Sequence, residues 1–438
     1  MPQAPITFVP PFRAPPAADR GPVAKRHVLY VPGYDPDQKV RSRALFIREL
    51  GRYGRRFGLA RKVSAARDLP EVPAQVWTVR AARDDWAVET TYEVLLWDDI
   101  VARDFRRPSL ATALALCAVT WGTVVTGLAA RLFRTNWRFG AVFTYPYLVI
   151  LLSELAAAAA GFAAGAVAGG LGGSGWVRGL AGAAGTGVVL ALLLPRFNGW
   201  YVWHLLRDWL FNWEHGSGRR YDYSARVDRF AERLCVVVAG TEADEVLVVG
   251  HSSGATTAME VASRALLRDP ALGRRGPEVA ALTLGTSLPA AAYHPKAEGI
   301  HADLRRLMTE RDVLWVEYQA PQDWLNAAWF NPVRMLPLGL AEAACTNPVI
   351  RSARFSDLVS EEVYRAMRFN PFRMHFQFMM ANDRAGEYDW FMIALGPWRL
   401  SRRIADPEGA AALVQPVTET LEPASGIAES LNTETARP

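Results

Sequence analysis

Cysteine is scarce in this chain, and its three copies are far apart. Cys117, Cys235 and Cys345 are the only ones among 438 residues, and their spacing is not that of a metal site. An odd and sparse set argues against a disulfide framework. Long basic runs are also missing, although the net charge is +5, so the charge gives little reason to expect a nucleic-acid partner. Many arginines flank apolar stretches instead, as expected of a protein beside anionic lipid.

The two ends of the chain lack the pattern of folded elements. Residues 1–22 are rich in proline and alanine and have no apolar core of a secretory signal, so we expect a flexible N-terminus. Residues 406–438 are polar and interrupted by proline, and we expect a disordered tail there. Between them, a chain that is 50% hydrophobic overall has enough apolar residues for a sizeable core.

Residues 108–213 contain three long apolar runs. Leu110–Ala130 has no charged residue, Ala141–Val177 has only Glu154, and Leu180–Pro195 is again apolar. Because about 20 apolar residues span the hydrocarbon core of a bilayer, we predict a membrane-embedded helical insert. A buried helical bundle in a soluble protein is the alternative. The small residues of the stretch 156–173 would suit close helix packing in lipid.

The segment Asn198–Trp213 is rich in aromatic residues and has polar residues among them. This composition favours an amphipathic helix that lies in the membrane interface. A fourth membrane crossing is the competing interpretation.

The flanking segments 23–107 and 214–405 alternate between strand and helix patterns. This alternation predicts one α/β domain with a mostly parallel sheet that is covered on both faces. Active sites in such sheets lie beyond the carboxyl ends of the strands. The expected strands are His27–Val31, Gln75–Val79, Tyr92–Trp97, Glu245–Val249, Val279–Leu284 and Val313–Tyr318. The expected helices are Asp37–Leu59, Tyr223–Val238, Ser253–Leu267 and Ala302–Met308.

The sequence Gly250-His251-Ser252-Ser253-Gly254 matches the pattern G-x-S-x-G. It follows an apolar strand directly and opens a helix, which is the context that a nucleophile elbow requires. Such a turn would project the Ser252 hydroxyl above the sheet. The backbone N–H of Ser253 would then point at a developing oxyanion, helped by the helix N-terminus.

On these residues the chain resembles the α/β-hydrolase superfamily, over roughly residues 27–99 and 221–395. It looks most similar to bacterial membrane-associated, lipase-like serine hydrolases. The resemblance implies the chain order nucleophile, acid, histidine. Of the seven histidines, only His375 lies in the final segment and keeps this order, so it is the candidate base. A packed histidine beside Phe376 is the alternative.

The candidate acid is Asp323, in the loop after the strand Val313–Tyr318. It would hold the imidazole in one tautomer, although a helix cap is the other interpretation of this residue. Glu317 lies within the strand and is less well placed. A second oxyanion donor should come from the loop after the first strand, where Gly33 and Tyr34 are the candidates. The usual HGGG form is absent, so the choice between them stays open.

These features together predict a membrane-anchored serine hydrolase that cleaves an ester or related acyl substrate of lipid-like character. The mechanism would use a Ser-His-Asp triad and an acyl-enzyme, with the lipid bilayer as a partner and without a metal or organic cofactor. Two alternatives remain. One is an acyltransferase that uses the same triad, and the other is a non-catalytic membrane scaffold with a hydrolase-like fold.

Membrane topology is constrained by the sheet. The strands His27–Val31 and Glu245–Val249 must join one sheet, so the insert must cross an even number of times. Three apolar runs conflict with this, so either the Ala/Gly-rich stretch 156–173 is re-entrant or interfacial, or a segment near Trp200 also crosses. We favour two crossings. The hydrolase side carries slightly more arginines near the ends of the runs, and no secretory signal is visible, which predicts a cytoplasmic hydrolase domain at a bacterial inner membrane.

Overall fold

The computed structural model describes residues 21–83, 85–107 and 109–417, without the side chain of Ser109. Most of the predicted flexible N-terminus, and the predicted tail from residue 418 onward, lie outside the described residues. The chain divides into two compact units, one made of Met1–Arg107 and Glu214–Pro438 and the other of Pro108–Trp213. The second unit therefore covers the residues 108–213 that the sequence predicts as an insert.

In the described residues, nine strands form one sheet in the order β2-β4-β5-β1-β6-β7-β8-β9, and β3 pairs with β4. The strands from β5 to β9 along this order run parallel to one another, while β4 is antiparallel to β5 and to its edge partners β2 and β3. The predicted α/β class with a mostly parallel sheet is confirmed. The strands are β1 (Lys25–Val31), β2 (Ala60–Val63), β3 (Arg67–Leu69), β4 (Ala74–Arg83), β5 (Trp86–Leu95), β6 (Glu245–His251), β7 (Glu278–Leu284), β8 (Val313–Gln319) and β9 (Val349–Ser352).

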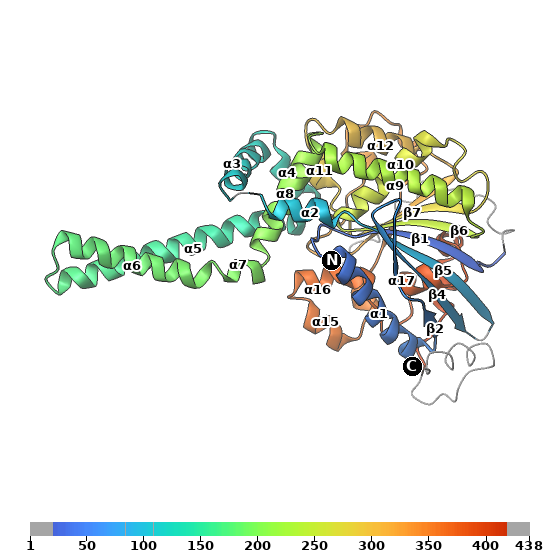
Figure 1. Ribbon diagram of the computed structural model, residues 1–438, viewed down its shortest axis with the longest axis horizontal. Coiled ribbons are helices and arrows are strands. Elements are labelled where there is room, and N and C mark those ends of the chain that lie inside the picture. Colours follow the sequence, from blue (N-terminus) through green and yellow to red (C-terminus); the bar gives the residue numbers. More distant parts are fainter. Residues whose placement is uncertain (1–20, 84, 108, 418–438) are drawn as a thin grey trace. The chain divides into compact units, whose positions relative to one another are not determined.

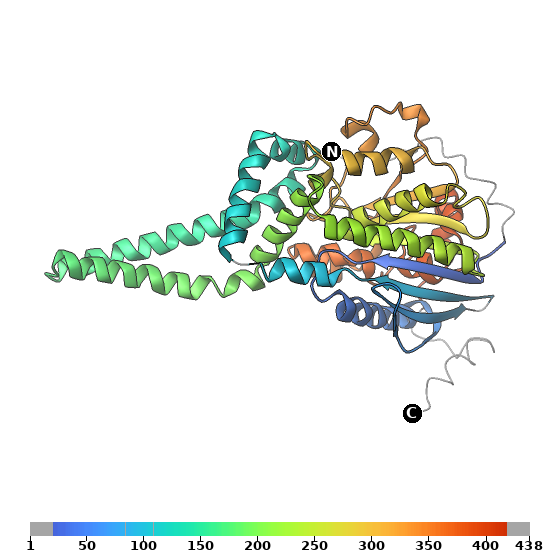
Figure 2. The same ribbon diagram turned by 45° about the horizontal axis from the view of Figure 1, so that its top comes forward.

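Helices cover both faces of this sheet (Figure 1). Helices α9 (Tyr221–Gly240), α10 (Ser253–Arg268) and α12 (Glu298–Met308) lie on one face, and α1 (Gln38–Phe57) and α17 (Trp390–Leu395) lie on the other (Figures 1 and 2). The central strands β6, β7 and β8 are buried along their whole length. Burial on both faces explains why they are nearly continuous apolar runs in the sequence.

The structure corrects the sequence analysis at the edges of the α/β unit. The analysis missed β2, β3 and β9, which are short and contain charged residues that hide the alternating pattern of a strand. It also expected disorder from Asp406 onward, but Pro407–Ala412 forms helix α19. The Asp406 carboxylate accepts a hydrogen bond from the Gly409 N–H at 2.8 Å and caps this helix, and proline is favoured at the first helical position.

The pairing of β1 with β6 determines where the loops after these strands meet. The two strands are adjacent and parallel, and Val31 is in register with Gly250. The loop that follows β1 therefore begins beside the turn that follows β6. This parallel pairing also joins residues from before and after the helical unit in one sheet.

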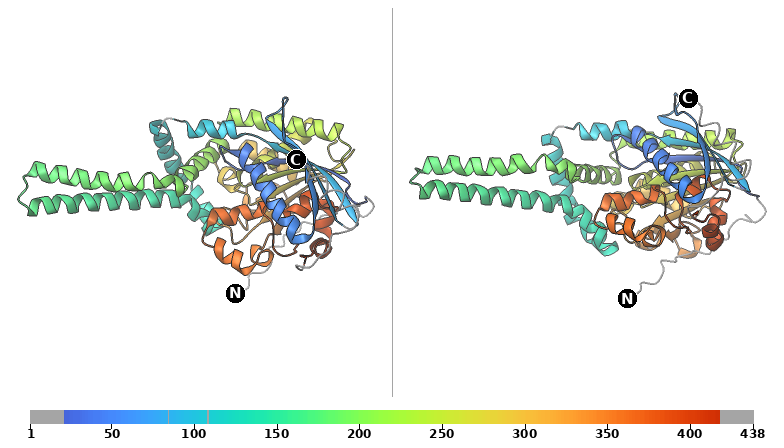
Figure 3. Two further views of the ribbon diagram at one scale, coloured as in Figure 1. Left: turned by 60° about the horizontal axis from the view of Figure 1, so that its bottom comes forward. Right: turned by 90° about the horizontal axis from the view of Figure 1, so that it is seen from below.

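The helical unit consists of α3 (Ser109–Val125), α4 (Leu128–Thr135), α5 (Trp137–Gly170), α6 (Gly175–Leu193), α7 (Arg196–Gly199) and the beginning of α8 (Val202–Gly216). Helices α5 and α6 lie side by side in every view (Figure 3). Small residues bring them together, since an added Cβ on Gly161 would lie 2.9 Å from the Gly182 carbonyl oxygen. The Ala/Gly-rich stretch 156–173, most of which lies in α5, thus contributes the close contact with α6.

Two helical stretches in the described residues are long and apolar enough to cross a membrane, Trp137–Gly170 and Gly175–Gly199. A third span would require α2 (Asp98–Phe105) and the apolar part of α3 to act together as one crossing. Most of the Ala/Gly-rich stretch 156–173 continues α5 and so belongs to one of these two long helices. The expectation that it is re-entrant or interfacial stays a prediction. The first apolar run is the interrupted one, since Gly127, with φ of 67°, separates α3 from α4.

The close contact between α5 and α6 can be tested with two valines in the same helix. A Cβ on Gly185 would lie 2.8 Å from the Ala160 carbonyl oxygen, whereas a Cβ on Gly187 would have no heavy atom within 4 Å. Gly185→Val should therefore lower the free energy of unfolding in detergent micelles by about 1–3 kcal/mol more than Gly187→Val. Equal losses in the two variants, measured by titration with a denaturing detergent, would contradict this packing.

Candidate active site

Ser252 occupies a strained turn between β6 and α10. Its backbone has φ of 61° and ψ of −128°, a conformation that residues with side chains rarely adopt. The two glycines of the motif allow the turn to be this tight. An added Cβ on Gly250 would lie 2.1 Å from the Gly254 carbonyl oxygen, and one on Gly254 would lie 2.3 Å from the Val31 carbonyl oxygen. Ser252 itself is partly exposed, so its hydroxyl can meet a ligand.

The loop after β1 lies against Ser252. A Cβ on Gly33 would be 3.0 Å from the Ser252 Cβ and 3.5 Å from its Oγ. The backbone N–H of Ser252 donates to the Leu284 carbonyl at the end of β7, over 2.9 Å. Residues that follow β1, β6 and β7 therefore meet at the carboxyl edge of the sheet, where ligands bind in open parallel sheets.

Asp323 and His375 form a buried pair. The Nδ1 atom of His375 lies 2.6 Å from Oδ2 of Asp323, and the two residues are 3% and 0% exposed. An ionised carboxylate only accepts hydrogen bonds, so in this pair Nδ1 of His375 is the donor, and in the neutral imidazole Nε2 then has a lone pair. Among the described residues, Nε2 of His375 is buried without a hydrogen-bond partner.

The sequence analysis expected Ser252 and His375 to lie within or near hydrogen-bond reach of each other. The described residues show no hydrogen bond between Ser252 Oγ and His375 Nε2, since that nitrogen has no partner there. Such bonds are often long in unliganded sites and shorten when substrate binds. His375 does face the same end of the sheet, because an added Cβ on Gly285, just after β7, would lie 3.1 Å from its Cε1.

His251 supports His375, a role that sequence reasoning missed. The two imidazole rings are 4.5 Å apart, and Nε2 of His251 donates to the His375 carbonyl at 3.1 Å. Burial and the nearby His375 hold the pKa of His251 well below its usual range, so His251 is neutral. The sequence signal for this role was the position of His251 between Gly250 and Ser252, directly beside the candidate nucleophile.

The loop that carries Asp323 is held by side chains that point back from β8. Gln319 donates through Nε2 to the Phe330 carbonyl at 2.8 Å and accepts the Trp329 N–H at 2.7 Å. Its Nε2 also lies 2.6 Å from Oε1 of Glu317. The backbone N–H of Ala327 donates to the Thr286 carbonyl at 3.0 Å, which ties the loop to the segment after β7. Glu317 is thus part of the support for the acid loop, and among the described residues it forms no hydrogen bond with His375.

The loop Pro32–Tyr34 is fixed by three side chains from other elements. The Trp97 indole N–H donates to the Pro32 carbonyl at 3.0 Å, and the Gln38 amide donates to the Gly33 carbonyl at 2.8 Å. The Tyr34 hydroxyl donates to Asp104 at 3.1 Å, so the Tyr34 side chain is directed toward α2. Gly33 is the candidate oxyanion donor that the structure brings against Ser252. Ser253, the other candidate, is the first residue of α10.

No protein-family description matches this chain, and comparisons with curated proteins and with solved structures found no match either.

The Glu317 carboxyl gives a pH dependence of stability that can be measured. Burial raises its pKa to about 7, while Gln319 and Thr283 lower it less by hydrogen bonding. A glutamate has a pKa of about 4.3 in an unfolded chain, so the folded state binds more protons between these values. The contribution of Glu317 to stability should therefore be greatest at low pH and be lost as pH rises through about 7.

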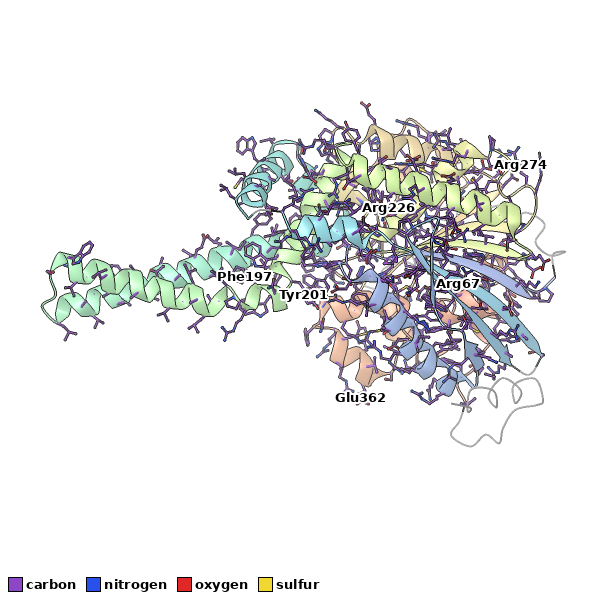
Figure 4. The ribbon with its side chains drawn as sticks, in the orientation of Figure 1. Arg67, Phe197, Tyr201, Arg226, Arg274 and Glu362 are labelled. Carbon is purple, nitrogen blue, oxygen red and sulfur yellow. The ribbon has the colours of Figure 1, made fainter. Side chains whose placement is uncertain are left out.

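Glu317→Gln should remove most of this fall in melting temperature between about pH 5 and pH 8. The matched control is Glu362→Gln in α15 (Glu361–Met367), because Glu362 is exposed at the surface (Figure 4). An unchanged pH slope in Glu317→Gln would show that the buried carboxyl does not titrate in this range.

Proposed function

We propose that this chain is a membrane-anchored serine hydrolase of the α/β-hydrolase type, with Ser252 as its nucleophile. The observation that carries the proposal is the buried Asp323–His375 pair, whose Nε2 atom has no partner among the described residues. It supports a general base because a neutral imidazole oriented by a carboxylate can accept the proton of a nearby hydroxyl. The strained backbone of Ser252 supports a nucleophile elbow.

In the proposed reaction, Ser252 Oγ attacks the acyl carbon of an ester, and its proton passes to Nε2 of His375. The carbonyl electron pair moves onto oxygen and gives a tetrahedral intermediate. When that intermediate collapses, the bond to the leaving alkoxide breaks and His375 returns the proton to it. Water then attacks the acyl-Ser252 ester by the same steps, which releases the acid and restores the hydroxyl. Asp323 stabilises the imidazolium that forms twice in this cycle.

The oxyanion would be met by backbone N–H groups of Gly33 and Ser253. The short approach of Gly33 to Ser252 supports this pair, because donors must lie near the position that the oxyanion takes. Tyr34 is the alternative donor from the same loop. Its side chain is already bound to Asp104, so it would contribute through its backbone N–H alone.

The two long apolar helices support anchoring in a lipid bilayer. We further propose two crossings and a hydrolase domain on the cytoplasmic side of a bacterial inner membrane. An acyl substrate of lipid-like character follows from this location, since such esters concentrate in the bilayer. Transfer of the acyl group to an alcohol uses the same acyl-enzyme, so analysis of the products separates an acyltransferase from a hydrolase.

The triad can be tested with purified full-length protein and a p-nitrophenyl ester as probe. Ser252→Ala and His375→Ala should each lower turnover by about four to six orders of magnitude, because the residues of a triad act as one unit. His301→Ala is the matched control, since the His301 ring bonds the Ala292 carbonyl, at 2.9 Å, and not a residue of the proposed triad among the described residues. Circular dichroism should show that all three variants are folded.

Hydrolysis by wild type that survives in folded Ser252→Ala would place the reaction at another residue. Absence of ester hydrolysis and of acyl transfer in wild type would favour the non-catalytic scaffold.

A further inference from the structure

The helical unit is joined to the α/β unit at two residues that bind each other. The chain leaves the α/β unit after Arg107 and returns to it at Glu214. The Arg107 guanidinium donates two hydrogen bonds to the Glu214 carboxylate, at 2.7 and 2.9 Å. Paired bonds of this kind fix both distance and orientation. They hold together the two points of the α/β unit at which the chain leaves and returns.

A second arginine connects this pair to α2. Arg220 is 5% exposed, and its Nη1 lies 2.8 Å from Oδ2 of Asp104 and 3.4 Å from Oε2 of Glu214. Arg107 also reaches Asp104, with Nη2 2.9 Å from Oδ1. Two cations and two carboxylates thus alternate around one cluster and balance in charge. We call Asp104, Arg107, Glu214 and Arg220 the insertion clamp.

A further carboxylate beside the clamp stabilises its charged form. Asp222 lies beside it, with Oδ1 3.1 Å from Nε of Arg220. Burial acts to raise the pKa of Asp222, but Arg220 more than offsets this and lowers it to about 2. Burial also acts to lower the pKa of Arg220, and the surrounding carboxylates outweigh it and raise the pKa above its usual value. Arg220 and Asp222 are therefore both charged at neutral pH.

The insertion clamp holds the Tyr34 hydroxyl. That hydroxyl donates to Oδ2 of Asp104 at 3.1 Å, the same oxygen that accepts from Arg220. The Tyr34 ring is 4% exposed and lies 5.9 Å from the ring of Trp97 and 6.0 Å from that of Phe105. A buried hydroxyl that loses its acceptor is destabilising, so Tyr34 would move if Asp104 moved.

We propose that the insertion clamp positions the loop Pro32–Tyr34 and makes the placement of the Gly33 N–H depend on how the insert is attached. The proposal rests on the proposed function only in naming this loop as part of an oxyanion site. Asp104 and Arg220 are then positioning residues, because they reach Ser252 only through Tyr34 and Gly33. Small displacements matter here, since a misplacement of about 1 Å at a reacting group can cost about 100-fold in rate.

The test measures amide hydrogen exchange in the full-length protein, which does not depend on any activity. Asp104→Asn and Tyr34→Phe should each raise exchange in the loop Pro32–Tyr34 by about tenfold or more, with exchange in β6 and α10 unchanged. The matched control is Asp312→Asn. Asp312 forms a 2.6 Å ion pair with Arg274, which lies at the surface (Figure 4).

A double-mutant cycle tests the pair at the base of the insert. Arg107→Gln and Glu214→Gln should each loosen the loop, and the double variant should loosen it by less than the sum of the two, because both single variants remove the same paired bonds. Turnover of the p-nitrophenyl ester should fall in the variants in which amide exchange of the loop Pro32–Tyr34 rises. We expect kcat in Tyr34→Phe to fall by about 10- to 100-fold with little change in KM, since only transition-state stabilisation is disturbed.

Each outcome decides a different claim. Unchanged loop exchange in folded Tyr34→Phe and Asp104→Asn would overturn the clamp proposal, whatever the activity. If loop exchange is faster in these variants but the wild type hydrolyses no ester, the clamp proposal is supported and the proposed function is contradicted. If Asp104→Asn does not fold, Tyr34→Phe removes a single hydroxyl and still gives the answer. A drop in melting temperature without a change in loop exchange would show that the clamp stabilises the fold but does not position the loop, which overturns the proposal.

Discussion

Gly254 has no room for a side chain, and the geometry of the candidate site depends on this. The carbonyl oxygens of Val31 and Pro32 lie 2.3 and 2.4 Å from the point where its Cβ would be. The N-terminus of α10 can therefore rest directly on the chain that leaves β1. Parallel pairing of β1 with β6 brings the two segments together, and the missing side chain of Gly254 lets their backbones touch. Gly33 meets Ser252 as a consequence.

The rest of the site is arranged around this contact by hydrogen bonds from buried side chains. Gln38 and Trp97 hold the backbone of the β1 loop, and Gln319 holds the loop that presents Asp323. His251 holds the backbone of His375 from within the serine motif itself. Most of these groups make their bonds out of water, where a lost partner is costly. The arrangement is thus preorganised, which is what a site that must stabilise a developing charge requires.

Much of this could be predicted from the sequence because the signals are local. The strand Glu245–Val249, the glycines around Ser252 and the apolar runs of the insert each have a pattern that short-range physics imposes. His375 and Asp323 were found from their order along the chain, and the structure brings them within 2.6 Å of each other. The edge strands β2 and β9 could not be found, because they are short, charged and stabilised by their neighbours. The clamp of Asp104, Arg107, Glu214 and Arg220 also has no local pattern, since its members meet only after the sheet has formed.

The central claim is that Ser252 is an activated nucleophile, and a fluorophosphonate probe tests it most directly. The probe phosphonylates a serine only where a base and an oxyanion site activate it, so no knowledge of the substrate is needed. Full-length protein in its membrane fraction should be labelled, and peptide mass spectrometry should find the adduct on Ser252. Labelling should be lost in Ser252→Ala and strongly slowed in His375→Ala. A wild-type protein that stays unlabelled, or carries the adduct on another serine, would contradict the account.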